Sequence, residues 1–305
     1  MDEKVLLNQF EDRLQRDVPL SRFTTSRVGG PARFFISAES ATQLAEDVRF
    51  LWEHNIPLLV LGSGANLLIS DTGLDLVVVH NHAKLITVDL RVESPSITAE
   101  SGAILTSVAR KAAEHGLTGL EWASAVPGTV GGAVYGNAGA FGSNTQASLL
   151  LAKILHRTKG YLSLTSEDMG YAYRSSALKR QPGDAIILSA SFAVQPGDPA
   201  LIEWTMKQFS ERRRSSQPTG PSTGSTFKNP PGDFAGRLIE AAGLKGTRIG
   251  GVSINEKHAN FFINDGTATA QDYYDLIQLA RQTVFEQFGV SLETEIEVIG
   301  DWQTK

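Results

Sequence analysis

Hydrophobic residues follow two different spacings along this chain, one typical of helices and one typical of strands. In the segment 40–55, Leu44, Val48 and Leu51 share one helical face behind Ser40, a residue type favoured as an N-cap. Helical spacing also predicts helices at 105–116, about 200–215, 234–242 and about 269–288. Short apolar runs predict strands at 57–62, 75–79, 84–90, 96–100, 149–158, 185–194, 260–263 and 295–300. Because these elements do not alternate as strict strand–helix–strand repeats, the pattern predicts an α+β protein.

A turn-rich segment divides this pattern into two parts. The sequence QPGDP at 195–199 carries the turn residues typical of a linker. A chain of 305 residues is long enough for two domains. We therefore expect one domain over residues 1–200 and a second over residues 201–305.

Composition narrows the chemistry that the chain can perform. It has no cysteine, which excludes disulfides, thiol catalysis and thiolate metal sites. The opening residues have no apolar core like that of a signal peptide, and no later apolar run could span a membrane, so we expect a cytoplasmic protein. The net charge of −5 argues against nucleic acid as a partner. Nine basic residues against four acidic ones in 205–260 favour a small anionic ligand instead.

Glycine is concentrated in three short turns. The segment 126–142, VPGTVGGAVYGNAGAFG, has six glycines between Gly128 and Gly142. Because glycine costs about 0.5–1 kcal/mol relative to alanine inside a helix or strand, this density predicts exposed turns that a ligand approaches closely. LGSGANLLI at 61–69 and TTSRVGG at 24–30 are two further glycine-bearing turns. Three such turns predict a large, phosphate-bearing cofactor.

The turn at 61–69 does not fit the dinucleotide fingerprint of a Rossmann fold. Leu67 stands where the third glycine of that fingerprint belongs, and the residues that follow read as a strand. No helix therefore opens here to face a phosphate. The remaining interpretations are an anion-binding nest of successive N–H groups and a plain strand-to-strand turn.

Eight motifs, in order along most of the chain, resemble the UDP-N-acetylenolpyruvoylglucosamine reductase family. They are TTSRVGG, LGSGANLLI, VPGTVGGAVYGNAGAFG, YAYRSS, STGSTFKNP, AGRLIEAAGLKG, SINEKHANFFIN and ETEIEVIG. The resemblance implies an FAD-binding domain of the p-cresol-methylhydroxylase type, with two α+β subdomains, followed by a smaller α+β substrate-binding domain. YRSSALK reaches the next predicted strand through RQPGD alone, which resembles the shorter second type of the family, without the tyrosine-bearing loop.

The resemblance also implies a reaction and the residues that carry it. NADPH would reduce non-covalently bound FAD, and the enolpyruvyl group of the UDP-sugar would then receive a hydride at C3 and a proton at C2. The implied catalytic residues are Arg174, Ser225 and Glu295. The implied FAD contacts are Arg27, Gly62, Ser63, Gly64, Ala65, Asn66, Leu67, Pro127, Gly128, Thr129, Gly131, Gly132, Asn137 and Gly139, and the implied substrate contacts are Tyr173, Lys228, Asn229 and His258.

The chemistry explains why those catalytic residue types are needed. Hydride addition pushes charge into the substrate carboxylate, so a cation or proton donor must stabilise it there. Arg174 can offer a bidentate fork, and Glu295 can donate a hydrogen bond if it keeps its proton. Ser225 is the implied donor of the C2 proton. Taken one at a time, an ion-pair arginine, a turn serine and a solvent-facing glutamate are the plainer interpretations, and His258 equally fits a satisfied core histidine.

One departure from the family and two alternative functions remain. Relatives often have a lysine where this chain has Ser216, so a cation for the substrate diphosphate would come from Arg214, Lys228 or another neighbour. A flavin-dependent alcohol or sugar oxidase would share the FAD domain, and a nucleotide-sugar-binding protein would share the fold without the chemistry. The resemblance implies a role in peptidoglycan synthesis and cell wall biogenesis, and through them in cell shape and cell division. We expect small-molecule substrates, no metal, no nucleic acid, no membrane and no obligate protein partner.

Overall fold

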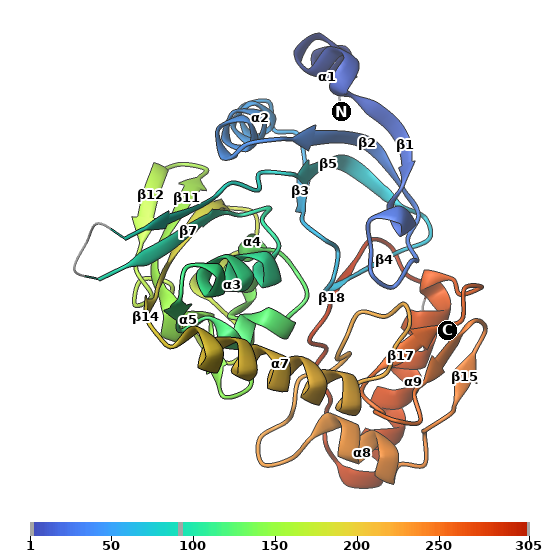
Figure 1. Cartoon of the computed structure of the whole chain (residues 1–305). Coiled ribbons are helices and arrows are strands. Elements are labelled where there is room, and N and C mark those ends of the chain that lie inside the picture. The colour runs from blue at the N-terminus through green and yellow to red at the C-terminus, as the bar shows by residue number, and fades with distance from the viewer. Residues whose placement is uncertain (1–2, 91–93, 304–305) are drawn as a thin grey trace. The chain divides into compact units, whose positions relative to one another are not determined.

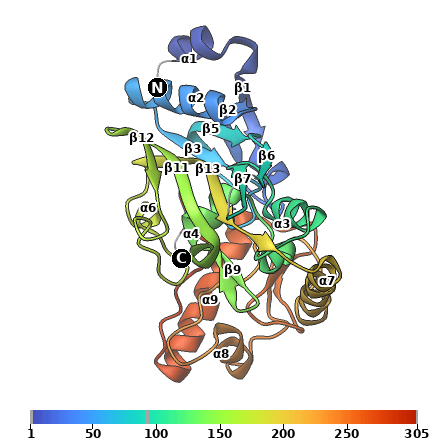
Figure 2. The same cartoon turned by 60° about the vertical axis from the view of Figure 1, so that its left-hand side comes forward.

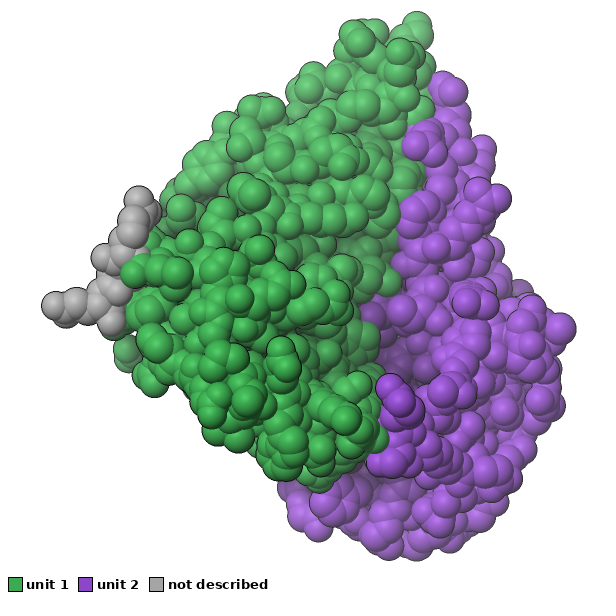
Figure 3. Space-filling model, viewed as in Figure 1, with its two compact units in different colours: residues 1–14, 35–63, 77–213 green, residues 15–34, 64–76, 214–305 purple. Residues whose placement is uncertain are grey.

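The structure, a computed structural model, describes residues 3–90 and 94–303. The chain forms two compact units (Figure 1, Figure 3). Unit 1 comprises residues 1–14, 35–63 and 77–213, and unit 2 comprises residues 15–34, 64–76 and 214–305. We expected a boundary at residue 200, but residue 200 lies within helix α7 (Pro199–Ser216). Unit 2 also differs from the expected second domain in that it includes two segments from the first quarter of the chain.

The larger part of unit 1 is a five-stranded sheet with helices on one face. The strands are β6 (Ile86–Asp89), β7 (Ser96–Glu100), β11 (Leu149–His156), β12 (Gly160–Leu164) and β13 (Ala185–Ala193). They lie in the order β12-β11-β13-β7-β6, and each neighbouring pair is antiparallel. Helices α3 (Leu105–Glu114) and α4 (Val130–Gly136) cover one face (Figure 2), and their buried side chains share a single hydrophobic core with the strands.

Unit 1 also contains α1 (Glu3–Phe10), α2 (Ala41–Glu53) and β3 (Leu58–Leu61). The expected helix behind Ser40 is α2, and the Ser40 Oγ accepts a 3.1 Å hydrogen bond from the amide of Gln43. The shorter elements of this unit are η1 (Glu11–Arg13), β8 (Leu117–Thr118), η3 (Glu121–Ala125), β9 (Gly139–Ala140), β10 (Ser143–Asn144), α5 (Thr145–Ser148), α6 (Ala177–Arg180) and β14 (Gln195–Pro196).

Unit 2 is built around one long helix, α9 (Ala270–Phe288). It packs with α8 (Ala235–Ala241) and with a three-stranded antiparallel sheet of order β15-β16-β17 into a second hydrophobic core. The strands of that sheet are β15 (Arg248–Ile249), β16 (Val252–Ile254) and β17 (Phe262–Asn264). The two early segments of unit 2, residues 15–34 and 64–76, contain β1 (Gln15–Pro19), η2 (Leu20–Arg22) and β4 (Leu67–Ile69). Strand β4 pairs in parallel with β18 (Glu297–Ile299).

The chain passes between the units inside two strands. Strands β2 (Pro31–Ala38) and β5 (Leu74–Asn81) each have residues assigned to both units, and the four-stranded sheet has the order β1-β2-β5-β3. Strand β3 pairs in parallel with the later half of β5, from Leu58 with Val77 to Leu61 with His80. Together the helices and the sheets confirm an α+β fold.

The expected elements are present at nearly their predicted positions, with one clear error. We expected the glycine cluster to stay outside regular structure, but residues 130–136 form helix α4 with Gly131 and Gly132 inside it. The Thr129 side chain caps this helix by accepting a hydrogen bond from the amide of Gly132. Burial of Val130, Ala133 and Val134 supplies the packing that the glycines lack.

Candidate active site

The glycine turn after β3 packs tightly against the TTSR segment within unit 2. The amide of Thr25 donates a 3.3 Å hydrogen bond to the carbonyl of Gly64. Gly64 has a φ of +59°, and a Cβ there would lie 2.1 Å from the carbonyl oxygen of Phe23. Only glycine permits this approach without strain. Two of the three predicted cofactor turns therefore meet, and Arg27 stands exposed beside them with a φ of +58°.

The same turn has backbone donors that the protein does not use. In the part of the chain that the structure describes, the amides of Gly64, Ala65 and Asn66 donate no hydrogen bond to another protein group. The Asn66 side chain instead donates 3.1 Å to the carbonyl of Glu295 and so fixes the end of the turn. Successive free amides next to a left-handed residue are the geometry of an anion-binding nest.

In unit 1, Gly62 and the start of α4 lie against each other. A Cβ on Gly62 would lie 2.6 Å from the Thr129 Oγ1. The amides of Val130 and Gly131 donate to the carbonyls of Ala103 and Ser101 at 2.9 and 2.8 Å. The turn at Ser101–Ala103 was missed in the sequence, because nothing local marks its contact with α4.

The glycines of this motif therefore differ in what surrounds them. A Cβ on Gly131 would meet the Ser101 backbone at 3.1 Å, so this glycine lets α4 pack against its neighbour. Apart from its chain neighbours and the backbone of its own helix, a Cβ on Gly132 would come no closer than 3.7 Å to a described atom, and one on Gly128 would meet nothing within 4 Å beyond its chain neighbours. Gly136 and Gly142 of the same motif likewise meet nothing within 4 Å, so Gly128 and Gly132 are the two predicted FAD contacts that adjoin open space rather than the only open positions of the motif.

Arg174 occupies a two-residue turn between Ala172 and Ser175. The amide of each of these two residues donates a 3.1 Å hydrogen bond to the carbonyl of the other. Arg174 has a φ of +54°, and its guanidinium lies 5.4 Å from the ring centroid of Tyr173 and 3.4 Å from the carbonyl of Gly139. A non-glycine residue in this backbone region marks strain of the kind that collects at functional sites.

Ser225 and Glu295 are brought onto neighbouring extended segments of unit 2. Ser225 forms an antiparallel bridge with Phe261, and Phe227 forms one with Thr294. Between these bridges the amide of Glu295 donates 2.9 Å to the carbonyl of Thr226. Ser225 and Glu295 are both half-buried, whereas Arg174 belongs to unit 1.

The predicted substrate contacts have protein partners of their own. The Lys228 ammonium forms a 2.8 Å ion pair with Glu293, and the Asn229 Oδ1 accepts a 3.1 Å hydrogen bond from the amide of Ala235. His258 Nδ1 accepts from the amide of Asn260 at 3.3 Å, and burial lowers the pKa of this histidine. Tyr173 is exposed.

A cation does lie beside Ser216, although it comes from elsewhere in the chain. The Lys257 Nζ donates 2.8 Å to the carbonyl of Arg214 and 3.0 Å to that of Gln217. Sequence analysis missed Lys257 because it lies far along the chain from the position that it reaches.

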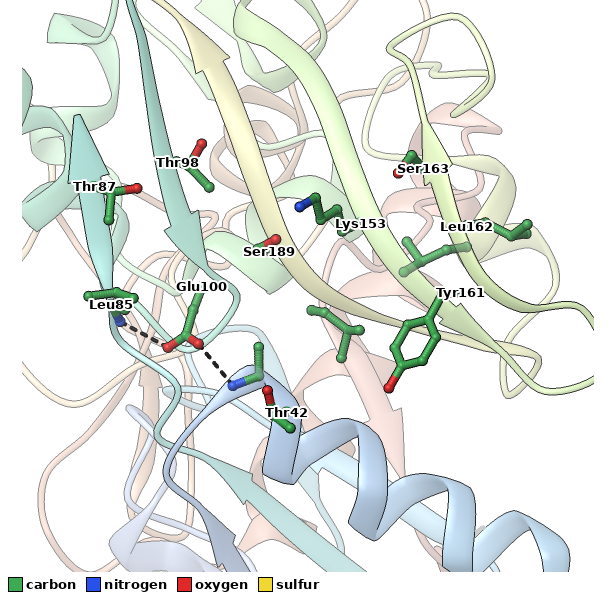
Figure 4. Close-up of a pocket in the computed structure, with 13 residues that line it drawn as sticks. Thr42, Leu85, Thr87, Thr98, Glu100, Lys153, Tyr161, Leu162, Ser163 and Ser189 are labelled. Atoms are coloured by element: carbon green, nitrogen blue, oxygen red, sulfur yellow. Dashed lines mark hydrogen bonds between the residues drawn. The ribbon is translucent and has the colours of Figure 1, made fainter. Parts of the chain in front are cut away.

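A hollow of about 500 Å³ lies on the face of the five-stranded sheet that α3 and α4 leave uncovered (Figure 4), and no predicted site residue lines it. The Glu100 carboxylate there accepts 3.0 Å hydrogen bonds from the amides of Ala41 and Leu85, drawn as dashed lines in the figure. Lys153, Ser189 and Thr98 also line it. The Glu100 carboxylate already accepts from the amide of Ala41, the first residue of α2, and so places a negative charge in the hollow. The hollow therefore does not resemble an anion site.

Residues 3–90 and 94–303 contain no group of three or more His, Cys, Asp or Glu residues placed to hold a metal ion. Within the same residues, every helix is too short or too polar to cross a membrane.

Comparison with known proteins assigns both parts of the chain. Residues 32–159 match the family described as FAD binding domain, and residues 216–299 match UDP-N-acetylenolpyruvoylglucosamine reductase, C-terminal domain. The UDP-N-acetylenolpyruvoylglucosamine reductase of Rubrobacter xylanophilus is 43% identical over 93% of this chain and 95% of its own length. That of Caldicellulosiruptor bescii is 44% identical over 95% of this chain and 91% of its own length.

Solved structures agree with this assignment. The UDP-N-acetylenolpyruvylglucosamine reductase of Thermus caldophilus aligns with a TM-score of 0.80 at 34% identity, over 94% of this chain and 98% of its own. A solvent-stable cholesterol oxidase aligns with a TM-score of 0.50 at 14% identity, over 62% of this chain and 39% of its own, and that likeness concerns the fold alone. The FAD-binding domain defines the class of protein, an FAD-containing oxidoreductase. Within that class, the chain belongs to the UDP-N-acetylenolpyruvoylglucosamine reductase family.

Proposed function

We propose that the protein reduces UDP-N-acetylenolpyruvoylglucosamine to UDP-N-acetylmuramate with NADPH, in the cytoplasmic synthesis of peptidoglycan precursors that cell shape and division require. The observation that carries this proposal is the hydrogen bond from the Glu295 amide to the Thr226 carbonyl, which sets Ser225 and Glu295 on adjoining segments. Membership of the reductase family favours this reaction over the oxidase and binding-protein alternatives.

The residues present fit a bound FAD. The unused amides of Gly64, Ala65 and Asn66 offer a nest for one phosphate, and Arg27 adds a positive charge in the same unit. Gly128 and Gly132 leave open space beside the backbone in unit 1. When bound, FAD would supply the hydride that reduces the enolpyruvyl group at C3.

The chain's own groups perform the rest of the reaction. The Arg174 guanidinium binds the substrate carboxylate, where negative charge develops as the hydride arrives. Protonated Glu295 donates a hydrogen bond to the same carboxylate region, and the Ser225 hydroxyl delivers its proton to C2. Lys257 and Lys228 place positive charge within unit 2 for the diphosphate.

A half-reaction experiment tests this function directly. NADPH added without oxygen to the purified yellow protein should bleach the flavin absorbance, and UDP-N-acetylenolpyruvoylglucosamine added afterwards should restore it. Bleaching by an alcohol or sugar without NADPH would identify an oxidase instead. A protein that binds the UDP-sugar but leaves the flavin absorbance unchanged would be a binding protein.

A further inference from the structure

The position of Arg174 depends on a turn that local preferences do not favour. Arginine at a φ of +54° is strained, and such a conformation persists only where the surroundings hold it in place. The turn itself contributes one pair of main-chain hydrogen bonds between Ala172 and Ser175. Contacts from outside the turn must therefore help to hold its main chain, and with it the position of Arg174.

Asn137 makes the most direct of these contacts. Its Nδ2 donates a 3.0 Å hydrogen bond to the carbonyl of Ala172, and its Oδ1 accepts 3.1 Å from the amide of Gln146. The residue is 5% exposed and ends α4 in the left-handed region, with φ 49° and ψ 56°, a conformation that asparagine tolerates better than most residues. Both the Nδ2 and the Oδ1 atoms of Asn137 therefore have a hydrogen-bond partner within the protein.

Two further side-chain hydrogen bonds hold the same turn to the same helix. The Tyr171 hydroxyl donates 3.0 Å to the carbonyl of Val134, and the Ser176 hydroxyl donates 2.6 Å to that of Tyr135. Tyr171 and Ser176, which flank the turn on either side, are therefore both anchored to the C-terminal end of α4. Asn137 reaches the residue between these anchors, Ala172, which opens the turn.

We infer that Asn137 is a positioning residue for the reduction step, and that it acts by fixing the turn that presents Arg174 to the substrate carboxylate. This inference rests on the proposed function, because it takes Arg174 as the group that binds that carboxylate. It also changes the role expected for Asn137, from contact with FAD to control of a residue that contacts the substrate.

Asn137→Asp is the most selective test. Aspartate keeps the acceptor for the Gln146 amide and tolerates the left-handed backbone, but a carboxylate cannot donate to the Ala172 carbonyl. Because a displacement of about 1 Å can cost on the order of 100-fold in rate, we expect flavin oxidation by the enolpyruvyl substrate to slow about 10- to 100-fold. Flavin content and flavin reduction by NADPH should stay at the level of the unmodified protein.

Thr145→Val provides a matched control. The Thr145 hydroxyl is buried and donates 3.1 Å to the carbonyls of Ala133 and Ala138, at the same end of α4, but makes no contact with the Arg174 turn. This variant should lose stability and keep both half-reactions. Equal slowing of the oxidative step in Thr145→Val and Asn137→Asp would reduce Asn137 to a structural role and overturn the inference.

Flavin content provides the second discriminating measurement. If Asn137→Asp loses flavin while the rate per bound flavin is unchanged, Asn137 contacts the cofactor and the inference is wrong. If Asn137→Asp does not fold, Asn137→Gly keeps the left-handed backbone without the side chain and serves in its place.

A double-mutant cycle with Arg174→Lys separates this inference from the proposed function. If Asn137 acts through Arg174, the double variant should be no slower than Arg174→Lys alone. Additive losses would overturn the inference and leave the proposed function standing. Full activity of Arg174→Lys would instead overturn the role of Arg174 in the proposed function.

Discussion

The amide of Glu295 donates a 2.9 Å hydrogen bond to the carbonyl of Thr226, the residue that follows Ser225. If Ser225 protonates C2, its hydroxyl has no part in flavin reduction by NADPH. Ser225→Ala should therefore keep near-normal flavin reduction and slow flavin oxidation by the enolpyruvyl substrate about 10²- to 10⁴-fold. Glu295→Ala should show the same asymmetry, since it removes the hydrogen-bond donor that Glu295 offers to the substrate carboxylate. Stopped-flow absorbance measures each half separately.

Ser222→Ala is the matched control for this experiment, because Ser222 lies in the same loop and its Oγ accepts a hydrogen bond from the amide of Gly224. It should leave both halves unchanged. Equal slowing of both halves in Ser225→Ala would mean that this serine shapes the site without supplying a proton.

Arg174→Gly should separate stability from activity. Glycine releases about 1–2 kcal/mol of left-handed strain, which offsets the loss of the contacts with Tyr173 and the Gly139 carbonyl. We expect the free energy of unfolding to stay level or rise while the oxidative half-reaction is lost. Urea denaturation and stopped-flow absorbance measure the two effects. Arg180→Gly, which lies at the end of α6 without a positive φ, should lose stability instead. A less stable Arg174→Gly would show that the turn is not strained.

Gly132→Ala tests where the flavin approaches the backbone. The added Cβ has only the Thr129 Oγ1 within 4 Å, and alanine favours the helix by about 1 kcal/mol, so the fold should be retained or strengthened. We expect weaker retention of FAD on gel filtration, because the methyl group occupies the open space beside α4. Gly64→Ala should lose fold and flavin together, since its Cβ collides with the Phe23 carbonyl. Full flavin content in Gly132→Ala would place the cofactor elsewhere.

FAD should be held without a covalent bond. The chain has no cysteine, and no histidine lies between His115 and His156. The Nδ1 atoms of these two histidines are engaged with their own segments, at the Lys111 carbonyl and the Thr158 amide respectively. Acid precipitation should leave a colourless pellet under a yellow supernatant. A yellow pellet would contradict this expectation.

His80 should make the protein less stable in mild acid. Burial, together with the nearby His82 and Lys84, lowers the pKa of His80 to about 4. The unfolded chain takes up this proton near the ordinary value of about 6.5, so it binds more protons than the folded protein between the two values. Stability should be fully present above about pH 6.5 and fall as the pH drops toward 4.

Urea denaturation across that pH range measures the effect. His80→Phe should flatten the pH dependence, whereas a change at the exposed His115 should not. An unchanged slope in His80→Phe would assign the acid sensitivity to other groups.

What the sequence predicts well is local. Helix α2 follows from the regular spacing of its buried side chains, and strand β13 follows from a short continuous apolar run, of which Ile186, Ile187 and Leu188 are all buried. Helix α4 was not predictable in this way, since its stability comes from the Thr129 cap and from packing against the Ser101–Ala103 turn. The candidate catalytic residues came from motif resemblance, and spacing could not show that the segments of Ser225 and Glu295 pair. That pairing depends on main-chain hydrogen bonds between distant parts of the chain.

The assembly of unit 2 has a consequence for the order of events during synthesis. The Asn66 side chain bonds the carbonyl of Glu295 across 229 residues, and β4 has β18 as its parallel partner. Closing a loop of that size costs chain entropy before any contact offsets it, which slows folding. On the ribosome, residues 15–34 and 64–76 emerge early and lack the late segments of unit 2 while residues 77–213 of unit 1 are made. Strand β4, which follows the glycine turn at Gly64, therefore gains its parallel partner β18 only when the last strand has been translated.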